Sequence, residues 1–265
     1  MAGSTSLWGD WLMHLLLIDA MNLIRRVYAA VEDSEFAAEA TRNKVIDIIG
    51  ANVRGRKATH LLMVYEDQEP TWRHRIWPEY KAGRSPMPEA LANDLSEMRA
   101  DLERSGIHSY RMSGWEADDV VATVADRAAR SGLQVTILST DKGFCQLVSE
   151  RISVLNHFDR FLWNEEAVHQ RWGLAPAQLT DYWALCGDQT NHLPGVPGIG
   201  KKGAAQVLDL CGSLDHAIGW PEVLPERLSN ALEQGIPSAI RTRVLATLRT
   251  DLELGISLSS LRAKS

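Results

Sequence analysis

The chain has 265 residues, of which 45% are hydrophobic and 23% charged, as in an ordinary globular protein with a sizeable core. No apolar run reaches the roughly 20 residues that a membrane-spanning helix needs, and the first 12 residues lack the basic start of a secretory signal. The cysteines, Cys145, Cys186 and Cys211, are widely spaced, which disfavours a disulfide framework or a zinc site. We expect a cytoplasmic protein without membrane contact.

Short apolar runs alternate with helical patterns up to about residue 164. The runs that predict buried strands are 14–20, 59–65, 107–112 and 134–139. The stretches with helical spacing are 36–53, 88–104 and 116–130. This alternation predicts an α/β fold with a central, mostly parallel sheet and right-handed crossovers. We assign this core to residues 13–164 and treat residues 1–12 as an N-terminal extension.

After about residue 165 the pattern changes, because no strong strand follows and helical spacing dominates. Helices are predicted at 165–172, 176–186 and 201–210, with further helical segments beyond them. We therefore expect residues 165–265 to form a helical lobe against the sheet.

Acidic residues follow three of the predicted strands. Asp19 ends the first, Glu66 and Asp67 follow the second, and Asp141 follows the fourth. Ligands of open parallel sheets bind beyond the carboxyl ends of the strands, where these side chains gather. One acid at a strand end is ordinary, whereas three strand ends with acids indicate a site.

A further acidic group opens the helix at 116–130. Glu116, Asp118 and Asp119 fall within one turn, where a helix dipole offsets part of their mutual repulsion. This triplet alone is also what a solvated helix start shows. Together with the strand-end acids it predicts a divalent cation, and oxygen ligands without histidine favour Mg²⁺ or Mn²⁺ over zinc.

The segment 71–88 is basic and aromatic. Arginine and lysine grip phosphates, and aromatic rings stack on unpaired bases, so the composition suggests contact with single-stranded nucleic acid. A solvated basic loop with packed tryptophans is the alternative. The residues concerned are Arg73, Arg75, Lys81 and Arg84 with Trp72, Trp77 and Tyr80.

The stretch LPGVPGIGKKGAA at 193–205 is typical of a helix-hairpin-helix. Glycines such as Gly198 and Gly200 let the backbone approach a phosphate, and the following helix offers unpaired N–H groups and a positive dipole end. The expected DNA contacts are Gly198, Ile199, Gly200, Lys201, Lys202 and Gly203. A tight turn between helices, without DNA binding, is the alternative.

Two long runs carry a family resemblance. GWEADDVVATVADRAARSGLQVTILSTDKGFCQL at 114–147 and DYWALCGDQTNHLPGVPGIGKKGAAQVL at 181–208 resemble the 5′ nuclease domain at the front of bacterial DNA polymerase I. Nearly the whole chain resembles the stand-alone bacterial flap endonucleases of the exonuclease IX type. The resemblance implies a PIN/5′ nuclease-like core, a helical arch at about 70–90 and a DNA-binding helix-hairpin-helix at about 185–212.

The resemblance also implies roles for single residues. Asp118 is the expected direct metal ligand, and the other metal-binding acids are Asp19, Glu66, Glu116, Asp119, Asp141 and Asp188. Lys81 and Arg84 correspond to the basic pair that steers the scissile phosphate, Arg73 to another phosphate contact, and Tyr80 to a stacking residue. A potassium ion is expected at the hairpin on the carbonyls of Leu185, Cys186, Pro194, Val196 and Ile199.

Three departures from the family pattern concern the metals. Glu66 stands where most relatives have aspartate, Gly143 replaces the second acid after TDK, and Asn191 replaces the acid three residues after Asp188. The first metal site is therefore expected to be intact and the second depleted.

The net charge of −6 alone disfavours nucleic-acid binding, yet eight of the acids belong to or adjoin the predicted site, and setting them aside leaves a slightly basic remainder. We expect a monomeric, metal-dependent 5′ nuclease acting on DNA with a 5′ flap or a single-strand/duplex junction. A branched-DNA-binding protein with weak or lost catalysis is the first alternative, and a PIN-type ribonuclease is the second.

Overall fold

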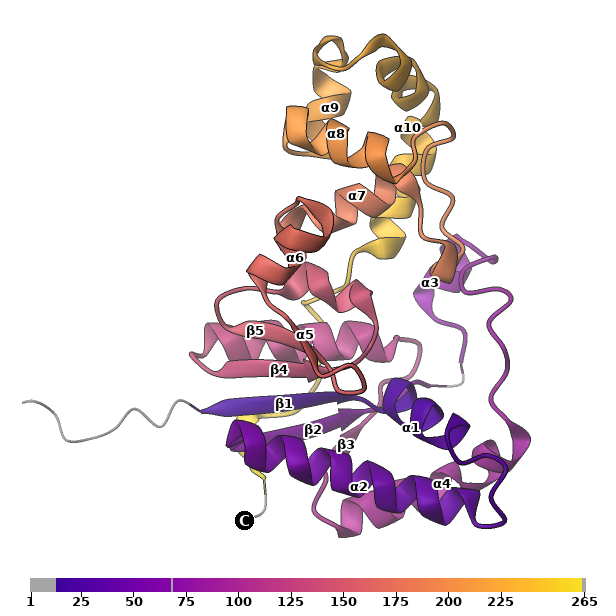
Figure 1. The fold of residues 1–265 in the computed structure, drawn as a ribbon, viewed down its shortest axis with the longest axis vertical. Helices are drawn as coiled ribbons and strands as arrows, with labels where there is room; N and C mark the ends of the chain where they lie inside the picture. Colours follow the sequence, from indigo (N-terminus) through magenta and orange to yellow (C-terminus); the bar gives the residue numbers. More distant parts are fainter. Residues whose placement is uncertain (1–12, 68, 264–265) are drawn as a thin grey trace, which may run out of the picture.

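The computed structural model describes residues 13–67 and 69–263. The extension predicted at 1–12 therefore lies outside the described residues. A six-stranded sheet forms the centre of the molecule (Figure 1). Its strands are β1 (His14–Asp19), β2 (His60–Val64), β3 (Ser109–Tyr110), β4 (Gln134–Leu138), β5 (Ile152–Asn156) and β6 (Phe161–Trp163). Their spatial order is β3-β2-β1-β4-β5-β6, and only β6 runs antiparallel to its neighbour.

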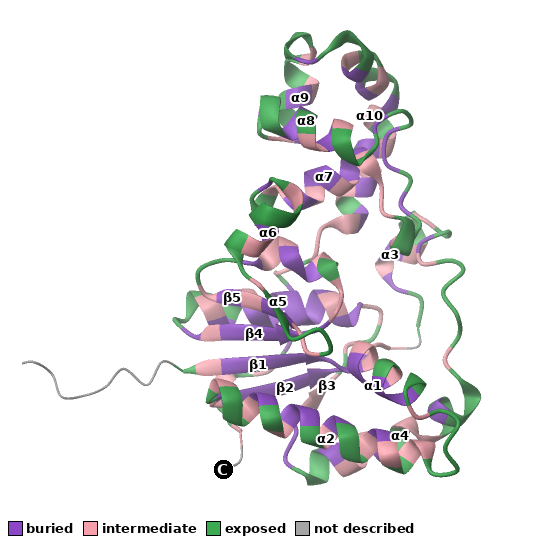
Figure 2. Ribbon diagram, viewed as in Figure 1, coloured by how far each residue is buried: buried purple, intermediate pink, exposed green. Residues whose placement is uncertain are grey.

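Helices cover both faces of this sheet, which confirms the predicted α/β class. The helices of this half are α1 (Ala20–Ala29), α2 (Ala37–Arg56), α3 (Trp72–Ile76), α4 (Glu89–Arg104) and α5 (Ala117–Arg130). Leu15 and Leu17 of β1 pack into the cluster that contains α5, and the alternate residues Leu16 and Ile18 pack against α1, α2 and α4. Figure 2 shows the buried residues concentrated along the strands and on the inner sides of these helices.

The second half is a helical lobe, also as predicted. Its helices are α6 (Glu165–Trp172), α7 (Leu179–Cys186), α8 (Lys201–Cys211), α9 (Leu214–Gly219) and α10 (Glu226–Ala246). Short 3₁₀ helices lie at Lys142–Leu147, Pro176–Gln178, Gln189–Asn191, Pro221–Val223 and Leu258–Leu261. The lobe has its own core, in which Leu185, Val207 and Leu232 are almost fully buried. The division between core and lobe after residue 164 stays a prediction.

After α10 the chain returns from the lobe to the sheet. Leu252 and Leu254 are buried in the same cluster as α5, and Arg262 forms a bridge with His60 of β2. The sequence pattern did not predict this return, which holds the lobe and the sheet together over a long chain distance.

Within the described residues no helix is long and apolar enough to cross a membrane. The three cysteines are free, with Cys145 and Cys211 buried and Cys186 partly buried.

Candidate active site

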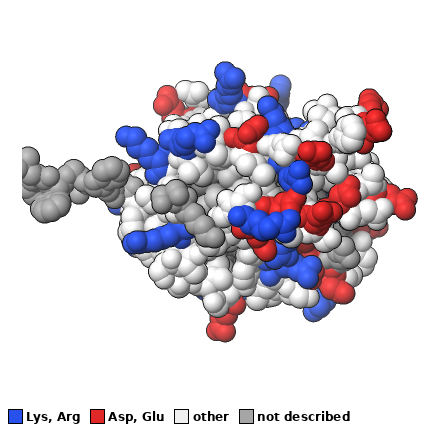
Figure 3. Space-filling model, turned by 90° about the horizontal axis from the view of Figure 1, so that it is seen from below, with Lys and Arg blue, Asp and Glu red and all other residues white. Residues whose placement is uncertain are grey.

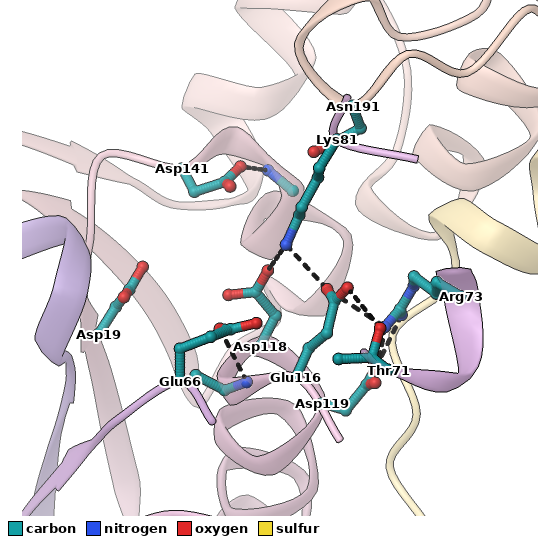
Figure 4. Close-up of polar contacts among 12 residues, drawn as sticks. Asp19, Glu66, Thr71, Arg73, Lys81, Glu116, Asp118, Asp119, Asp141 and Asn191 are labelled. Carbon is teal, nitrogen blue, oxygen red and sulfur yellow. Dashed lines mark hydrogen bonds and ion pairs between the residues drawn. The ribbon is translucent and has the colours of Figure 1, made fainter. Parts of the chain in front are cut away.

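Four carboxylates gather at the carboxyl edge of the sheet. Asp19 is the last residue of β1, Glu66 follows β2, Asp141 follows β4, and Asp118 lies in the first turn of α5. Since β1, β2 and β4 are parallel neighbours, their ends meet at one place. Figure 4 shows the four side chains around a common area, as the sequence predicted. We call these four residues the acid cluster.

Each acid is positioned by its own element. Asp19 caps α1 by accepting a hydrogen bond from the backbone N–H of Asn22 at 3.2 Å, and its other oxygen accepts from the hydroxyl of Ser139 at 2.9 Å. Asp141 caps the following 3₁₀ helix through the N–H of Gly143 at 2.7 Å. Glu66 accepts from the N–H of Ala117 at the start of α5 at 3.3 Å. Ser139 was not predicted, although it directly precedes Thr140 and Asp141.

Three carboxylates of the acid cluster, those of Asp118, Glu66 and Asp19, have raised pKa values. Burial raises the pKa of Asp118 to about 7, and the charges of Asp19 and Asp141 act in the same direction while Lys81 opposes them. Burial likewise raises the pKa of Glu66 to about 7. Burial raises that of Asp19 to about 6 against its hydrogen bond from Ser139. Such crowded carboxylates are stabilised by a positive charge.

Lys81 reaches into this region from the segment after α3. Its Nζ lies 2.9 Å from Oε2 of Glu116 and 3.6 Å from Oδ2 of Asp118. Burial acts to lower the pKa of Lys81, but the charges of Asp118 and Glu116 hold it well above its usual value. The backbone of Lys81 is left-handed, with φ of 55°, a conformation that costs energy for a residue with a side chain. Lys81 is therefore held in place by the fold around it.

Arg73 and Asp119 differ from their predicted roles. Arg73 is 1% exposed, and its Nη1 and Nη2 lie 2.6 and 2.8 Å from the two oxygens of Asp119. Its Nε donates to the carbonyl of Leu245, and Nη2 also donates to that of Thr247. A guanidinium with all these acceptors is not available to a DNA phosphate, and Asp119, itself buried, is not available to a metal. Both residues are structural.

Glu116 and Tyr80 also make their contacts within the protein. Glu116 is fully buried, with one oxygen 3.2 Å from the hydroxyl of Thr71 and the other contacted by Lys81 and the Tyr80 hydroxyl. Tyr80 is only 5% exposed and packs with Leu193. Glu116 therefore holds Lys81 instead of a metal, and Tyr80 is not placed to stack on a base. Because the sequence places Tyr80 in a basic loop, its burial could not be predicted locally.

Arg84, Asn191 and Asp188 form a chain of hydrogen bonds that is exposed at Arg84 and half-buried at Asp188. The Nδ2 of Asn191 donates to Oδ2 of Asp188 at 2.6 Å, and Nη2 of Arg84 donates to Oδ1 of Asn191 at 2.7 Å. The backbone N–H of Lys81 also donates to the Asn191 carbonyl at 3.1 Å. Asp188 thus contacts Asn191 and Thr190, outside the acid cluster. Asn191, which stands where the family has an acid, therefore connects the lobe to both Lys81 and Arg84.

The glycine-rich loop between α7 and α8 forms a compact hairpin. Gly187 and Gly195 have φ of 76° and 65°, and a side chain on Gly195 would come within 2.3 Å of the Gly187 nitrogen. Helix α10 supports the loop, since the hydroxyl of Ser238 donates to the Gly195 carbonyl at 2.6 Å. These contacts fix the backbone at the start of α8.

The predicted DNA contacts of the hairpin are only partly at the surface. Lys201, Lys202, Gly198 and Gly200 are exposed. Gly200 has φ of −88° with open space around it, so the turn itself does not require glycine there. Two other predicted contacts face inward. The side chain of Ile199 is buried, and a side chain on Gly203 would meet Leu228 at 3.2 Å.

The carbonyls proposed for potassium belong to the same hairpin. Those of Leu185 and Val196 each accept a backbone hydrogen bond, from Val196 at 2.8 Å and from Ile199 at 3.0 Å. Pro194 lies against Gly187, and Cys186 lies against Gly195. The five positions lie on one hairpin, and their use as ion ligands stays a prediction.

The chemistry of the acid cluster fits a hard divalent cation, since its donors are carboxylate oxygens. Within residues 13–67 and 69–263, no group of three or more acidic, histidine or cysteine side chains is arranged tightly enough to hold a metal as it stands. The raised pKa values of Asp118, Glu66 and Asp19 arise first from burial, and the charges of neighbouring carboxylates raise them further.

Charged side chains of both signs lie on the side of the molecule that α2 and α4 form. Figure 3, which views the molecule from below, shows acidic and basic side chains interspersed there. Along α2 and α4 many of them are paired, as Arg42 is with Asp101 at 2.5 Å and Arg99 with Glu103 at 3.1 Å. The face is therefore a solvated surface of mixed charge.

Comparison with known protein families covers the chain from residue 14 onward. The N-terminal, resolvase-like domain of 5′-3′ exonucleases matches residues 14–173. The C-terminal SAM fold of 5′-3′ exonucleases matches residues 174–265.

Similar proteins span nearly the same length. The flap endonuclease Xni of Pectobacterium carotovorum is 41% identical over 252 residues, which is 94% of this chain and 95% of that protein. The flap endonuclease Xni of Photorhabdus laumondii is 40% identical over 253 residues, or 95% and 98%. Among solved structures, a T5 5′-exonuclease with zinc ions bound has a TM-score of 0.76 at 21% identity and covers 89% of this chain and 90% of its own. At that identity the likeness is one of fold.

Proposed function

Because this chain belongs to the 5′-3′ exonuclease family, with flap endonucleases as relatives at about 40% identity, we propose that it is a structure-specific 5′ flap endonuclease. It hydrolyses a DNA phosphodiester where a 5′ single strand meets a duplex. The observation that carries the proposal is the acid cluster, which lies beside Lys81.

Magnesium or manganese is the proposed cofactor, held by Asp118, Asp19, Glu66 and Asp141 directly or through water. When bound, such a cation supplies a water of lowered pKa and neutralises charge on the reacting phosphate. Asp118 is the proposed central ligand, because its carboxylate contacts Lys81 and lies near both Glu66 and Asp19 (Figure 4).

Lys81 and Arg84 act on the scissile phosphate. In the structure Lys81 is paired with Glu116 and Asp118, and a phosphate entering beside the acid cluster competes for the same ammonium group. Glu116 and Tyr80 aim Lys81 by holding its environment fixed. Arg84, exposed on the segment beyond Lys81, is kept near by Asn191. Positive charge placed where negative charge builds lowers the barrier.

The hairpin is the proposed grip on the duplex. Lys201 and Lys202 are exposed at the start of α8, where the unpaired N–H groups and the helix dipole favour a phosphate. A potassium ion on the hairpin carbonyls would add to this grip. Such contacts reach the DNA backbone, so the shape of the DNA is recognised and not its sequence. All proposed groups come from one chain, so a monomer acting on cytoplasmic DNA suffices.

A second candidate is a branched-DNA-binding protein with weak catalysis. The observation that favours it is Asn191, which occupies a family acid position and donates a 2.6 Å hydrogen bond to Asp188 in place of supplying a carboxylate. Gly143 likewise supplies no carboxylate beside Asp141. Tight binding to flap DNA with negligible cleavage would select this candidate.

The deciding experiment incubates the purified protein with a labelled 5′-flap duplex, with Mg²⁺ or with a chelator. We expect cleavage at the junction only with the metal. A 3′-flap duplex, a blunt duplex and an RNA flap of the same length serve as controls, and cleavage of RNA alone would favour the ribonuclease alternative.

The grip of the hairpin is tested by DNA binding. The double change Lys201→Glu with Lys202→Glu should weaken binding, and the slope of log affinity against log salt concentration should become shallower by about one for each lost phosphate contact. K⁺ should tighten binding more than Na⁺ at equal ionic strength.

A further inference from the structure

Helix α10 carries an arginine whose charge no carboxylate balances. Arg241 lies over the ring of Trp77, with its Cζ 4.2 Å from the ring centroid. Within the described part of the chain no hydrogen bond or ion pair is formed by its guanidinium, and its Nε is buried without an acceptor. Buried donors and charges are normally paired, so an unpaired guanidinium indicates a partner from outside the chain.

Arg241 lies where two parts of the proposed DNA surface meet, the hairpin with its leading loop and the segment that carries Lys81. On α10 it is adjacent to Thr242, whose hydroxyl accepts the N–H of Gly195 in the hairpin at 3.4 Å. Its stacking partner Trp77 donates from Nε1 to the carbonyl of His192 at 3.1 Å, in the loop that leads into the hairpin. In Figure 1 this loop descends from the lobe beside α3. The position therefore lies between the hairpin and the segment that carries Lys81.

The stack on Trp77 leaves the two Nη atoms of the Arg241 guanidinium available for hydrogen bonds. The face of the indole ring orients the planar guanidinium. The N–H donors lie in the plane of the guanidinium, along its edge, and are not used in stacking on the ring. Since Nε is the atom that is both buried and without an acceptor, the two Nη atoms keep access to solvent. Two parallel donors on a fixed plane match the oxygens of a phosphodiester, and prior fixing of the side chain reduces the entropy lost on binding.

We propose that Arg241, held on Trp77, binds a phosphate of the duplex portion of the DNA substrate, between the hairpin grip and the acid cluster. The proposal rests on the proposed function, because it needs a DNA duplex seated on the hairpin. It adds a contact that neither the glycine-rich signature nor the acid cluster contains. The competing explanation is that the stack merely packs α10 against α3.

The test measures binding of a 5′-flap duplex in the presence of a chelator, so that no cleavage occurs, for wild type, Arg241→Gln and Arg241→Lys. Arg241→Gln should bind about fivefold more weakly, and its salt dependence between about 50 and 200 mM should be shallower by about one phosphate contact. Arg241→Lys keeps the charge and should retain the slope with a smaller loss. Arg130→Gln is the matched control, because this exposed arginine lies at the far end of α5, about 18 Å from Asp118.

A second measurement identifies the phosphate. Single methylphosphonate replacements along the duplex remove one charge at a time, and one of them should weaken wild type but leave Arg241→Gln unaffected. If Arg241→Gln does not fold, the same scan with Arg241→Lys decides, with a reduced loss expected at the same phosphate. Unchanged affinity and slope in Arg241→Gln, or weaker binding with an unchanged slope and no coupled phosphate, would overturn the proposal. Flap cleavage by wild type in the same preparation shows that the proposed function stands independently of that result.

Discussion

The guanidinium of Arg73 forms a buried, two-point ion pair with the carboxylate of Asp119, with its Nη1 2.6 Å from Oδ2. This pair joins the segment after β2 to the first turn of α5. Through Leu245 and Thr247 it also joins both to the end of α10. The phosphate-steering segment, the acid-bearing helix and the lobe are thus fixed to one another directly behind the acid cluster.

Breaking this pair should destabilise the whole protein. Asp119→Ala leaves the Arg73 cation buried without its main partner, and we expect a loss of about 3–5 kcal/mol in the free energy of unfolding. Urea titration followed by tryptophan fluorescence measures it. Asp126→Ala on the same helix, which removes an exposed ion pair with Arg130, should cost no more than about 1 kcal/mol. Equal losses in the two variants would contradict the structural role assigned to Asp119.

Asp118→Asn should abolish most of the chemistry without loss of fold. The change removes one charge from the proposed metal site and keeps the shape, so we expect cleavage to fall at least about a hundredfold. Binding to flap DNA in a chelator should remain or improve, because less negative charge faces the phosphates. Asp126→Asn, on the same helix but away from the cluster, should cleave like wild type. Near-normal turnover of folded Asp118→Asn would remove Asp118 from the site.

Asn191 and Arg84 should act as one unit. If Asn191 positions Arg84, then Asn191→Ala and Arg84→Ala should each slow single-turnover cleavage by about tenfold, and the double variant should be little slower than either. Substrate affinity should change less than the rate, since the proposed action is on the reacting phosphate. Additive effects of the two substitutions would show that the hydrogen bond does not serve catalysis. Asn191→Gln, which retains the amide, tests for partial rescue.

Substitution of two glycines of the hairpin should affect the stability of the fold very differently. Gly195→Ala adds a side chain where φ is 65° and the nearest backbone atom would be 2.3 Å away, so we expect a loss of roughly 2–4 kcal/mol. Gly200→Ala should fold like wild type, because its φ is −88° and the space is open. Thermal unfolding of the two variants makes the comparison. If Gly200→Ala then binds DNA poorly, close approach of a phosphate is the cause.

The acid cluster should make stability depend on pH in a defined direction. Burial raises the pKa of Asp118 and Glu66 to about 7, so between pH about 4 and 7 the folded state holds protons that the unfolded state has released. The contribution of the cluster therefore stabilises the metal-free protein at low pH and is lost as pH rises toward neutrality.

Asp118→Asn isolates this effect from that of the histidines. Burial lowers the pKa of His14, His60 and His157, so their contribution to stability grows as pH rises. The stability of Asp118→Asn relative to wild type should increase as pH rises from about 5 to 8 in a chelator. Denaturant titrations at a series of pH values measure the difference. Saturating Mg²⁺ should reduce it by neutralising the wild-type cluster, and a difference independent of pH would refute the assignment.

The sequence by itself determined the frame of this protein. Periodicity placed β1, β2, β4 and α5 within about two residues of their bounds, because a buried parallel strand and an amphipathic helix each leave a strong local pattern. The rule that parallel strands present ligands at their carboxyl ends then brought Asp19, Glu66 and Asp141 together, and these residues do share one edge of the sheet.

Only the tertiary structure decided which charged residues are free to act. Arg73 and Lys81 have the same charge and lie in one segment, but Arg73 is enclosed by the end of α10 whereas Lys81 reaches the acid cluster. Likewise Asp118 and Asp119 are neighbours on one helical turn that face different surroundings. Burial and ion pairing arise from contacts between residues far apart in the chain, 46 positions for Arg73 with Asp119 and 172 positions for Arg73 with Leu245, and no local pattern carries that information.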